Sequence, residues 1–139
     1  MASLDMTEIL LETYRLADQI IESEEVSRYL QLKKQLREDA QVQALIREFQ
    51  KKKERFEECQ RFGHYHPDYH AAKEEAEALQ RRMRKHPLIA AYLEAEAVLD
   101  QLLHQVSRTI AHSVSESIKV PANDPLDGNT SVKRCGFTF

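Results

Sequence analysis

Three histidines, His64, His66 and His70, lie close together in the chain. Imidazole nitrogens are common zinc ligands, so the spacing His-x-His-x3-His is a candidate metal site. Structural zinc sites normally show four recognisable ligands, and no carboxylate or cysteine spacing nearby completes such a set. His66 also has an ordinary position, because it precedes Pro67, a residue type that often opens a helix. The pattern therefore does not favour a metal centre here.

The two cysteines are far apart in the sequence and predict different environments. Cys59 falls on the same face of a helical pattern as Phe49 and Phe56, which is typical of a small buried side chain. Cys135 follows Lys133 and Arg134, where positive charge favours the thiolate form. Two such cysteines form no disulfide framework. We expect a reducing compartment and a cytoplasmic protein.

Two basic runs, Lys51 to Lys53 and Arg81 to Lys85, are candidates for phosphate contacts. Acidic residues surround the first run, and the second run lies near a predicted helix C-terminus, where cations suit the helix dipole. The net charge of the chain is -3, whereas a nucleic-acid-binding domain is typically basic. The two basic runs are therefore interpreted as solvent-exposed helix faces. Direct RNA binding through these basic faces is the alternative hypothesis.

The sequence contains no nucleophile motif, no phosphate-binding loop and no paired-carboxylate arrangement. We therefore expect a protein that is not an enzyme.

The composition indicates an all-α fold. Of the 139 residues, 42% are apolar and 31% charged, and residues that favour helices outnumber the β-branched and aromatic ones. Apolar residues recur every three or four positions in successive blocks, which predicts a bundle of about five helices. The predicted blocks are 4–22, 23–38, 39–62, 67–85 and 88–118.

Each junction between the predicted blocks carries a helix signal. Ser23 and Asp39 are suitable N-terminal caps, and Gly63 suits the left-handed position that follows a helix. Pro67 and Pro87 are suitable first residues of the next two helices. The third and fourth helices are thus expected to form a long helical hairpin.

The expected organisation is a single helical domain over residues 1–118 and a flexible C-terminal tail over residues 119–139, where Pro, Gly, Asn and Asp replace the periodic pattern. No stretch approaches the roughly 20 apolar residues that a membrane span requires.

Helix length and charge both suggest a partner. A fifth helix of about 31 residues would be roughly 46 Å long, which exceeds the diameter of about 37 Å expected for a compact chain of this size. Residues 1–30 carry seven acids against two bases, and residues 33–61 carry nine bases against six acids. We expect a homo- or hetero-oligomer.

Two segments resemble a known family. Gln60-Arg61-Phe62-Gly63-His64-Tyr65-His66-Pro67-Asp68-Tyr69 and Val114-Ser115-Glu116-Ser117-Ile118-Lys119-Val120-Pro121 resemble the YlbF branch of the YlbF/YmcA family of Gram-positive bacteria, and the likeness extends over nearly the whole chain. The resemblance implies a non-enzymatic regulator that assembles with YmcA and YaaT, supports competence, sporulation and biofilm development, and assists ribonuclease Y in maturing messenger RNAs.

The resemblance also concerns a cofactor. Related proteins carry several cysteines in the tail, and the family's complex can hold [4Fe–4S] clusters, whereas this tail retains only Cys135. Because such a cluster usually needs four thiolates, we expect no cofactor in the isolated chain. Cys135 is a candidate ligand only of a cluster shared with partners.

The residues expected to contact partners lie at the hairpin tip and near the end of the fifth helix. Loops often carry aromatic contact residues, but aromatic side chains at the tip could equally pack the hairpin shut, so both interpretations of Phe62, Tyr65 and Tyr69 stay open. The candidate residues are Phe62, Gly63, Tyr65, His66, Pro67, Tyr69, Val114 and Ile118.

Overall fold

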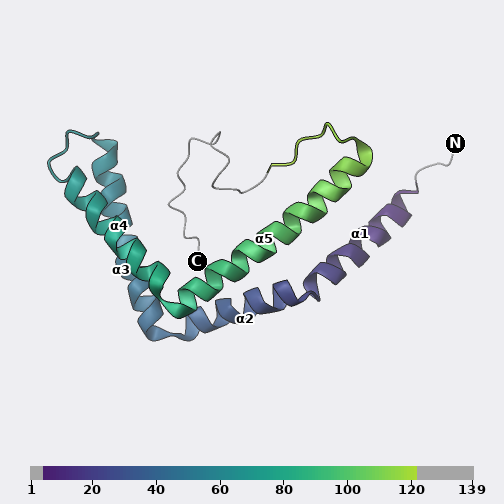
Figure 1. The fold of residues 1–139 in the computed structure, drawn as a ribbon, viewed down its shortest axis with the longest axis horizontal. Coiled ribbons are helices and arrows are strands. Elements are labelled where there is room, and N and C mark those ends of the chain that lie inside the picture. The colour runs from purple at the N-terminus through teal and green to yellow at the C-terminus, as the bar shows by residue number, and fades with distance from the viewer. Residues whose placement is uncertain (1–4, 122–139) are drawn as a thin grey trace. The chain divides into compact units, whose positions relative to one another are not determined.

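The structure is a computed structural model and describes residues 5–121 (Figure 1). Within this range the chain forms helices and no strand, which confirms the predicted all-α fold. The helices are α1 (Met6–Ile21), α2 (Glu24–Glu38), α3 (Ala40–Arg61), α4 (Tyr69–Lys85) and α5 (Pro87–Val114).

The caps at Ser23 and Asp39 are confirmed. The Ser23 hydroxyl accepts a hydrogen bond from the Val26 amide at 3.4 Å. Asp39 ends α2 and caps α3, and its carboxylate accepts from the amides of Gln41 and Val42 at 2.9 and 3.0 Å. A single residue therefore makes the whole connection between two helices.

The helices α3 and α4 lie side by side as a hairpin (Figure 1). The apolar seam predicted for α4 is confirmed, because all five of its residues are buried: Tyr69, Ala72, Ala76, Leu79 and Met83.

The start of α4 differs from the prediction. Pro67 does not open the helix, which begins at Tyr69. Two successive turns precede it: the His66 amide donates to the Gly63 carbonyl at 3.1 Å, and the Tyr69 amide donates to the His66 carbonyl at 3.0 Å. These turns use the residues between Gly63 and Tyr69, so the helix starts two residues later than Pro67.

Gly63 has the left-handed conformation expected after a helix, with φ of +86°. A Cβ atom at this position would meet no atom within 4 Å, so the backbone alone makes glycine preferable. Gly63→Ala is expected to lower the free energy of unfolding by about 1–2 kcal/mol, the usual cost of a left-handed conformation. Gly63→Asn should cost less, because asparagine tolerates this region. Urea unfolding of both variants checks this, and equal stability of the alanine variant and the parent would contradict it.

Among residues 5–121 the buried core extends only from Leu36 to Ala95. It is built from the end of α2, one face each of α3 and α4, and the first turns of α5, where Ile89 and Tyr92 are fully enclosed. Neither α1 nor the part of α5 after Ala95 contributes a buried residue.

The fifth helix is shorter than predicted. It begins at Pro87, one residue before the predicted start, and ends at Val114 after 28 residues, so the prediction that it reaches Ile118 is wrong. After the helix, the Ser115 hydroxyl accepts from the Ser117 amide at 3.3 Å, and the Ile118 amide donates to the Ser115 carbonyl at 3.2 Å. Serine side chains compete in this way with helical hydrogen bonding.

A polar chain joins α2 to the first part of α5. The hydroxyls of Tyr29 and Tyr92 are hydrogen-bonded at 3.3 Å, Lys33 donates to Tyr29 at 3.4 Å, and Tyr92 donates to Glu96 at 3.4 Å. The two tyrosine rings also pack with centroids 5.5 Å apart. Burial, followed by the hydrogen bond with Tyr29 and the charge of Glu96, raises the pKa of Tyr92 well above its ordinary value.

The raised pKa of Tyr92 predicts a loss of stability in alkali. The neutral hydroxyl is favoured in the folded chain, so its contribution is present below pH about 10, the ordinary tyrosine pKa, and is lost as the pH rises further. In Tyr92→Phe, the free energy of unfolding should fall by about 1 kcal/mol at neutral pH and depend less on pH above 10. Denaturant unfolding between pH 7 and 11 measures both quantities. Tyr65→Phe, at a fully exposed position, is the matched control, and an unchanged alkaline slope in Tyr92→Phe would contradict the assignment.

By its internal contacts the chain divides into two units, Met1–Leu99 and Asp100–Phe139, with the boundary inside α5. The predicted division at residue 118 stays a prediction. Most of the predicted tail, residues 122–139, lies outside the described residues, and so does Cys135.

Candidate interaction surfaces

The structure does not assemble a metal site from the three histidines. The rings of His64 and His70 each pack at nearly right angles to the Tyr69 ring, with centroids 4.8 and 5.3 Å from it. The Nδ1 atom of His66 instead accepts a hydrogen bond from the Asp68 amide at 3.2 Å. Among residues 5–121, no group of three or more His, Cys, Asp or Glu side chains is placed to hold a metal ion.

Cys59 is buried, as its helical position predicted. It packs with Tyr69 and Ala72, and Phe56 covers this cluster. A [4Fe–4S] cluster does not fit these surroundings, because the site offers one thiol among apolar side chains whereas such a cluster usually has four thiolate ligands.

The hairpin tip contains both packed and exposed aromatic residues. Tyr69 is 6% exposed and packs against Phe56 with ring centroids 5.5 Å apart, so its role in the hairpin is packing. Phe62 is 74% exposed and Tyr65 is 100% exposed. The Phe62 ring lies 5.9 Å from that of His66, and Gly63 and Pro67 shape the turn around them. Phe62 and Tyr65 thus do not close the hairpin, and their contact with a partner stays a prediction.

The basic run in α3 is largely paired with acids. Lys52 donates to Glu75 of α4 at 2.7 Å, and this hydrogen bond is the main reason why the pKa of Glu75 is lowered. Arg55 approaches the same carboxylate at 3.6 Å, and Lys53 lies 3.7 Å from Glu57. These ion pairs leave the run with little net positive charge to offer a phosphate.

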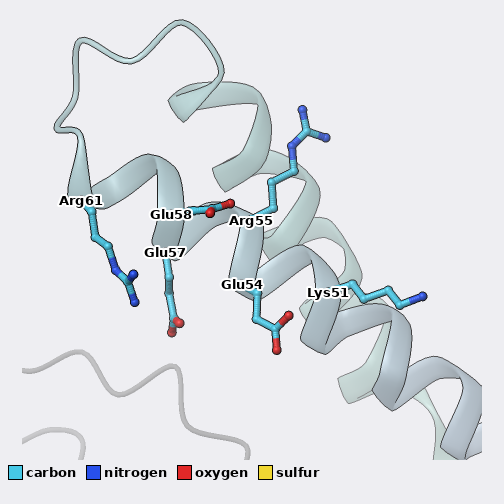
Figure 2. A pocket seen from close by; sticks show the side chains of 6 residues that line it. All are labelled: Lys51, Glu54, Arg55, Glu57, Glu58 and Arg61. Atoms are coloured by element: carbon cyan, nitrogen blue, oxygen red, sulfur yellow. The ribbon is translucent and has the colours of Figure 1, made fainter.

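One face of α3 carries an open hollow lined by charges of both signs. Figure 2 shows the side chains of Glu54, Glu57 and Arg61 pointing to the same side of the helix, while Lys51 and Arg55 extend away from them. Glu58 completes the lining. Three acids and three bases make this surface electrically balanced, and it does not resemble a phosphate-binding cleft.

The largest departure from the sequence-based site prediction is on α1. Six apolar side chains of this helix are between 42% and 66% exposed: Met6, Ile9, Leu10, Leu11, Tyr14 and Ile21. All of them except Leu11 fall within about 140° of the helix circumference at 100° per residue, and we call these five the α1 stripe. The periodicity of α1 was evident in the sequence, but an apolar stripe can face either the chain's own core or another protein. The excess of acids in the first 30 residues was the one sequence feature that favoured contact with another protein.

The part of α5 beyond Leu99 also presents apolar side chains to solvent. Leu103 and Ile110 are exposed, and Val114 at the end of the helix is 78% exposed. Ile118, which follows the helix, is 39% exposed. Val114 and Ile118 are therefore accessible within the described chain, as contact with a partner requires.

None of the helices in the described range is long and apolar enough to cross a membrane.

Comparisons with known proteins place this fold in a regulatory family. The family described as control of competence regulator ComK, YlbF/YmcA, matches residues 9–115. The chain is 36% identical over 136 residues to the regulatory protein YlbF of Bacillus subtilis (strain 168), covering 97% of this chain and 89% of that protein. It is 27% identical over 124 residues to UPF0342 protein DSY1594 of Desulfitobacterium hafniense (strain Y51), covering 89% and 88% of the two chains.

A solved structure shows the same relationship. A chain in the crystal structure of Bacillus subtilis RicA in complex with RicF is similar to this one with a TM-score of 0.75 and 35% identity, covering 83% of this chain and 100% of that chain. The resemblance of the hairpin tip and the α5 end is thus confirmed over most of the sequence, and the chain belongs to the YlbF/YmcA family of competence regulators.

Proposed function

We propose that this protein is a non-enzymatic regulatory adaptor of the cytoplasm. It assembles with YmcA-like and YaaT-like proteins, assists ribonuclease Y in processing messenger RNAs, and supports competence, sporulation and biofilm development. The observation that carries the proposal is the exposed α1 stripe, an apolar surface of the kind that monomeric proteins rarely leave uncovered. The similarity to a chain crystallised in the RicA and RicF complex supports the same function.

A shared cluster belongs to this proposal. The whole sequence has two cysteines, one of them the buried Cys59, so this chain would supply one ligand, Cys135, and its partners the others. Replacing Cys135 with serine would then weaken the visible absorbance of the complex without affecting the isolated chain.

The proposal is tested by mixing the protein with the YmcA-like and YaaT-like proteins of the same organism. Light scattering after gel filtration should show a complex heavier than any single component. In cells that lack this chain, uncleaved precursors of ribonuclease Y substrates should accumulate and disappear again when the parent gene is restored. Failure to form any complex, together with normal transcript processing in the deletion strain, would overturn the proposal.

Direct RNA binding is the second candidate, and the free basic residues at the end of α4 are the observation in its favour. Arg81, Arg82 and Lys85 have exposed side chains and no ion pair in the described part of the chain. If they bind phosphates, the affinity for a labelled RNA should fall steeply between 50 and 200 mM salt. Titration at the two salt concentrations distinguishes the candidates, since an adaptor without an RNA site shows no salt-dependent binding.

The hairpin tip gives a separate prediction. Replacing Tyr65 and His66 together with alanine should leave the melting temperature nearly unchanged, because Tyr65 is fully exposed and the hydrogen bond that His66 accepts from the Asp68 amide lies at the surface, where water can replace it. If the tip contacts the YmcA-like partner, the dissociation constant should rise by roughly tenfold or more, as for a truncated aromatic contact residue. The double variant Glu74→Ala/Glu77→Ala on α4 serves as a surface control. Unchanged affinity would show that the tip is not a recognition surface.

A further inference from the structure

The charges beside the α1 stripe identify the kind of partner that can cover it. Residues 5–22 contain five acids and one base: Asp5, Glu8, Glu12, Asp18 and Glu22 against Arg15. Glu12 forms an ion pair with Arg15, and the other four acids form none within the described residues. The helix therefore has a net charge of about -4 beside an exposed apolar surface.

The acids border the stripe on both sides. At 100° per residue, Asp18 lies just beyond the edge made by Tyr14 and Ile21, between that edge and the exposed Leu11. On the other side, Glu12 follows the edge made by Ile9. A helix that packs on the stripe would bring its own flanking residues close to these carboxylates. Opposite charges at such flanking positions favour pairing, as in coiled coils, and like charges oppose it.

We propose that α1 docks a basic amphipathic helix of a partner protein, whose apolar seam covers the stripe and whose lysines or arginines face the acidic edges. A second copy of α1 is a poor occupant, because two helices of the same negative charge would repel each other. The same charge disfavours the anionic surface of a membrane. This inference rests on the proposed adaptor function and adds the location and chemistry of the docking site.

The stripe is long enough for such a contact. The 16 residues of α1 span about 24 Å at 1.5 Å per residue, or more than four helical turns. Its residues have the spacing of a helix-in-groove contact, in which apolar anchors recur at i+3, i+4 and i+7. The ion pairs at the edges would be exposed to solvent, so their contribution should fall as salt screens them.

The test uses the full chain and two synthetic helical peptides of 18 residues with the same leucine seam. One peptide has lysines beside the seam, and the other has glutamates. The lysine peptide should bind about tenfold more tightly at 50 mM salt, because several exposed ion pairs each add a small contribution, and the preference should shrink at 300 mM. Equal affinities, a preference for the glutamate peptide, or no binding of either peptide would overturn the proposal.

Two charge-reversed variants locate the effect. In Asp18→Lys/Glu22→Lys the preference for the lysine peptide should be lost, and α1 should persist because cations suit the C-terminal end of a helix. The control Glu48→Lys/Glu74→Lys makes the same change of charge at exposed positions of α3 and α4 and should keep the preference. Equal loss in both variants would show that only the net charge of the protein matters, which contradicts a site on α1.

The oligomeric state and the natural complex complete the test. If light scattering shows a dimer of the chain alone that Leu10→Asp dissociates, the occupant is a second copy and the proposal is wrong. A complex with the YmcA-like protein that forms without any peptide preference would leave the adaptor function standing and overturn the docking chemistry. A clear preference for the lysine peptide without any complex with the YmcA-like protein would support the docking chemistry and contradict the adaptor function.

Discussion

Met83→Ala is expected to destabilise the protein by about 2–5 kcal/mol, the usual cost of truncating a large buried side chain to alanine. Met83 is 0% exposed and lies in the last turn of α4, next to the turn into α5. In the described part of the chain the core is confined to residues from Leu36 to Ala95, so few other buried side chains can compensate for the contacts that Met83 loses. The melting temperature should fall by roughly 10 °C.

Thermal and urea unfolding of Met83→Ala measure this effect, and Arg82→Ala is the matched control. Arg82 precedes Met83 in the same helical turn but is exposed, so its replacement should change the free energy of unfolding by less than about 0.5 kcal/mol. A loss below 1 kcal/mol in Met83→Ala would mean that the end of α4 is not tightly packed in solution.

Truncation of the α1 stripe should have the opposite pattern, with a large effect on association and a small one on folding. In Leu10→Ala/Tyr14→Ala the dissociation constant for the YmcA-like partner should rise by about 30-fold or more, since central apolar anchors of an interface often contribute 2 kcal/mol or more. The melting temperature should change little, because no residue of α1 is buried in the chain.

Calorimetric titration of the partner into this variant and into Gln19→Ala, an exposed position on the polar side of the same helix, makes the comparison. Circular dichroism of both variants checks that α1 remains helical. If the stripe variant binds as well as the parent while the polar variant does not, the contact lies on the other side of α1.

The elements that are stabilised by contacts within the chain could be predicted from the sequence. The seam of α4 was predicted residue by residue, because its spacing of three and four leaves one apolar face that must be covered. The cap at Asp39 and the left-handed Gly63 were equally predictable, since each depends on the chemistry of one residue and its immediate neighbours.

The errors arose where local signals competed. Pro67 is a suitable first residue of a helix, but the turns that follow Gly63 delay α4 to Tyr69. The apolar pattern of α5 continues to Ile118, but the hydrogen bonds of Ser115 end the helix at Val114. In both cases a side-chain or turn hydrogen bond outweighed the signal on which the prediction was based.

The candidate site was less predictable than the fold. The sequence marked Tyr65 and Tyr69 as similar aromatic residues four positions apart, but one is fully exposed and the other is in the core. The difference arises because Tyr65 lies in the turn before α4, whereas Tyr69 is the first residue of the helix and belongs to its buried face. For α1, periodicity shows that one face is apolar, but it does not show whether that face packs on the chain's own core or on another protein.

The separation between the core and the exposed helical ends has an evolutionary consequence. Substitutions in α1, or in α5 beyond Glu96, meet little resistance from the folding of the chain, because no buried residue lies in either segment. Duplicated genes can therefore acquire different partners through changes in α1 and the end of α5 while they inherit an unchanged hairpin. A chimera that carries α1 of one family member on the hairpin of another should fold like its hairpin parent and bind like its α1 parent.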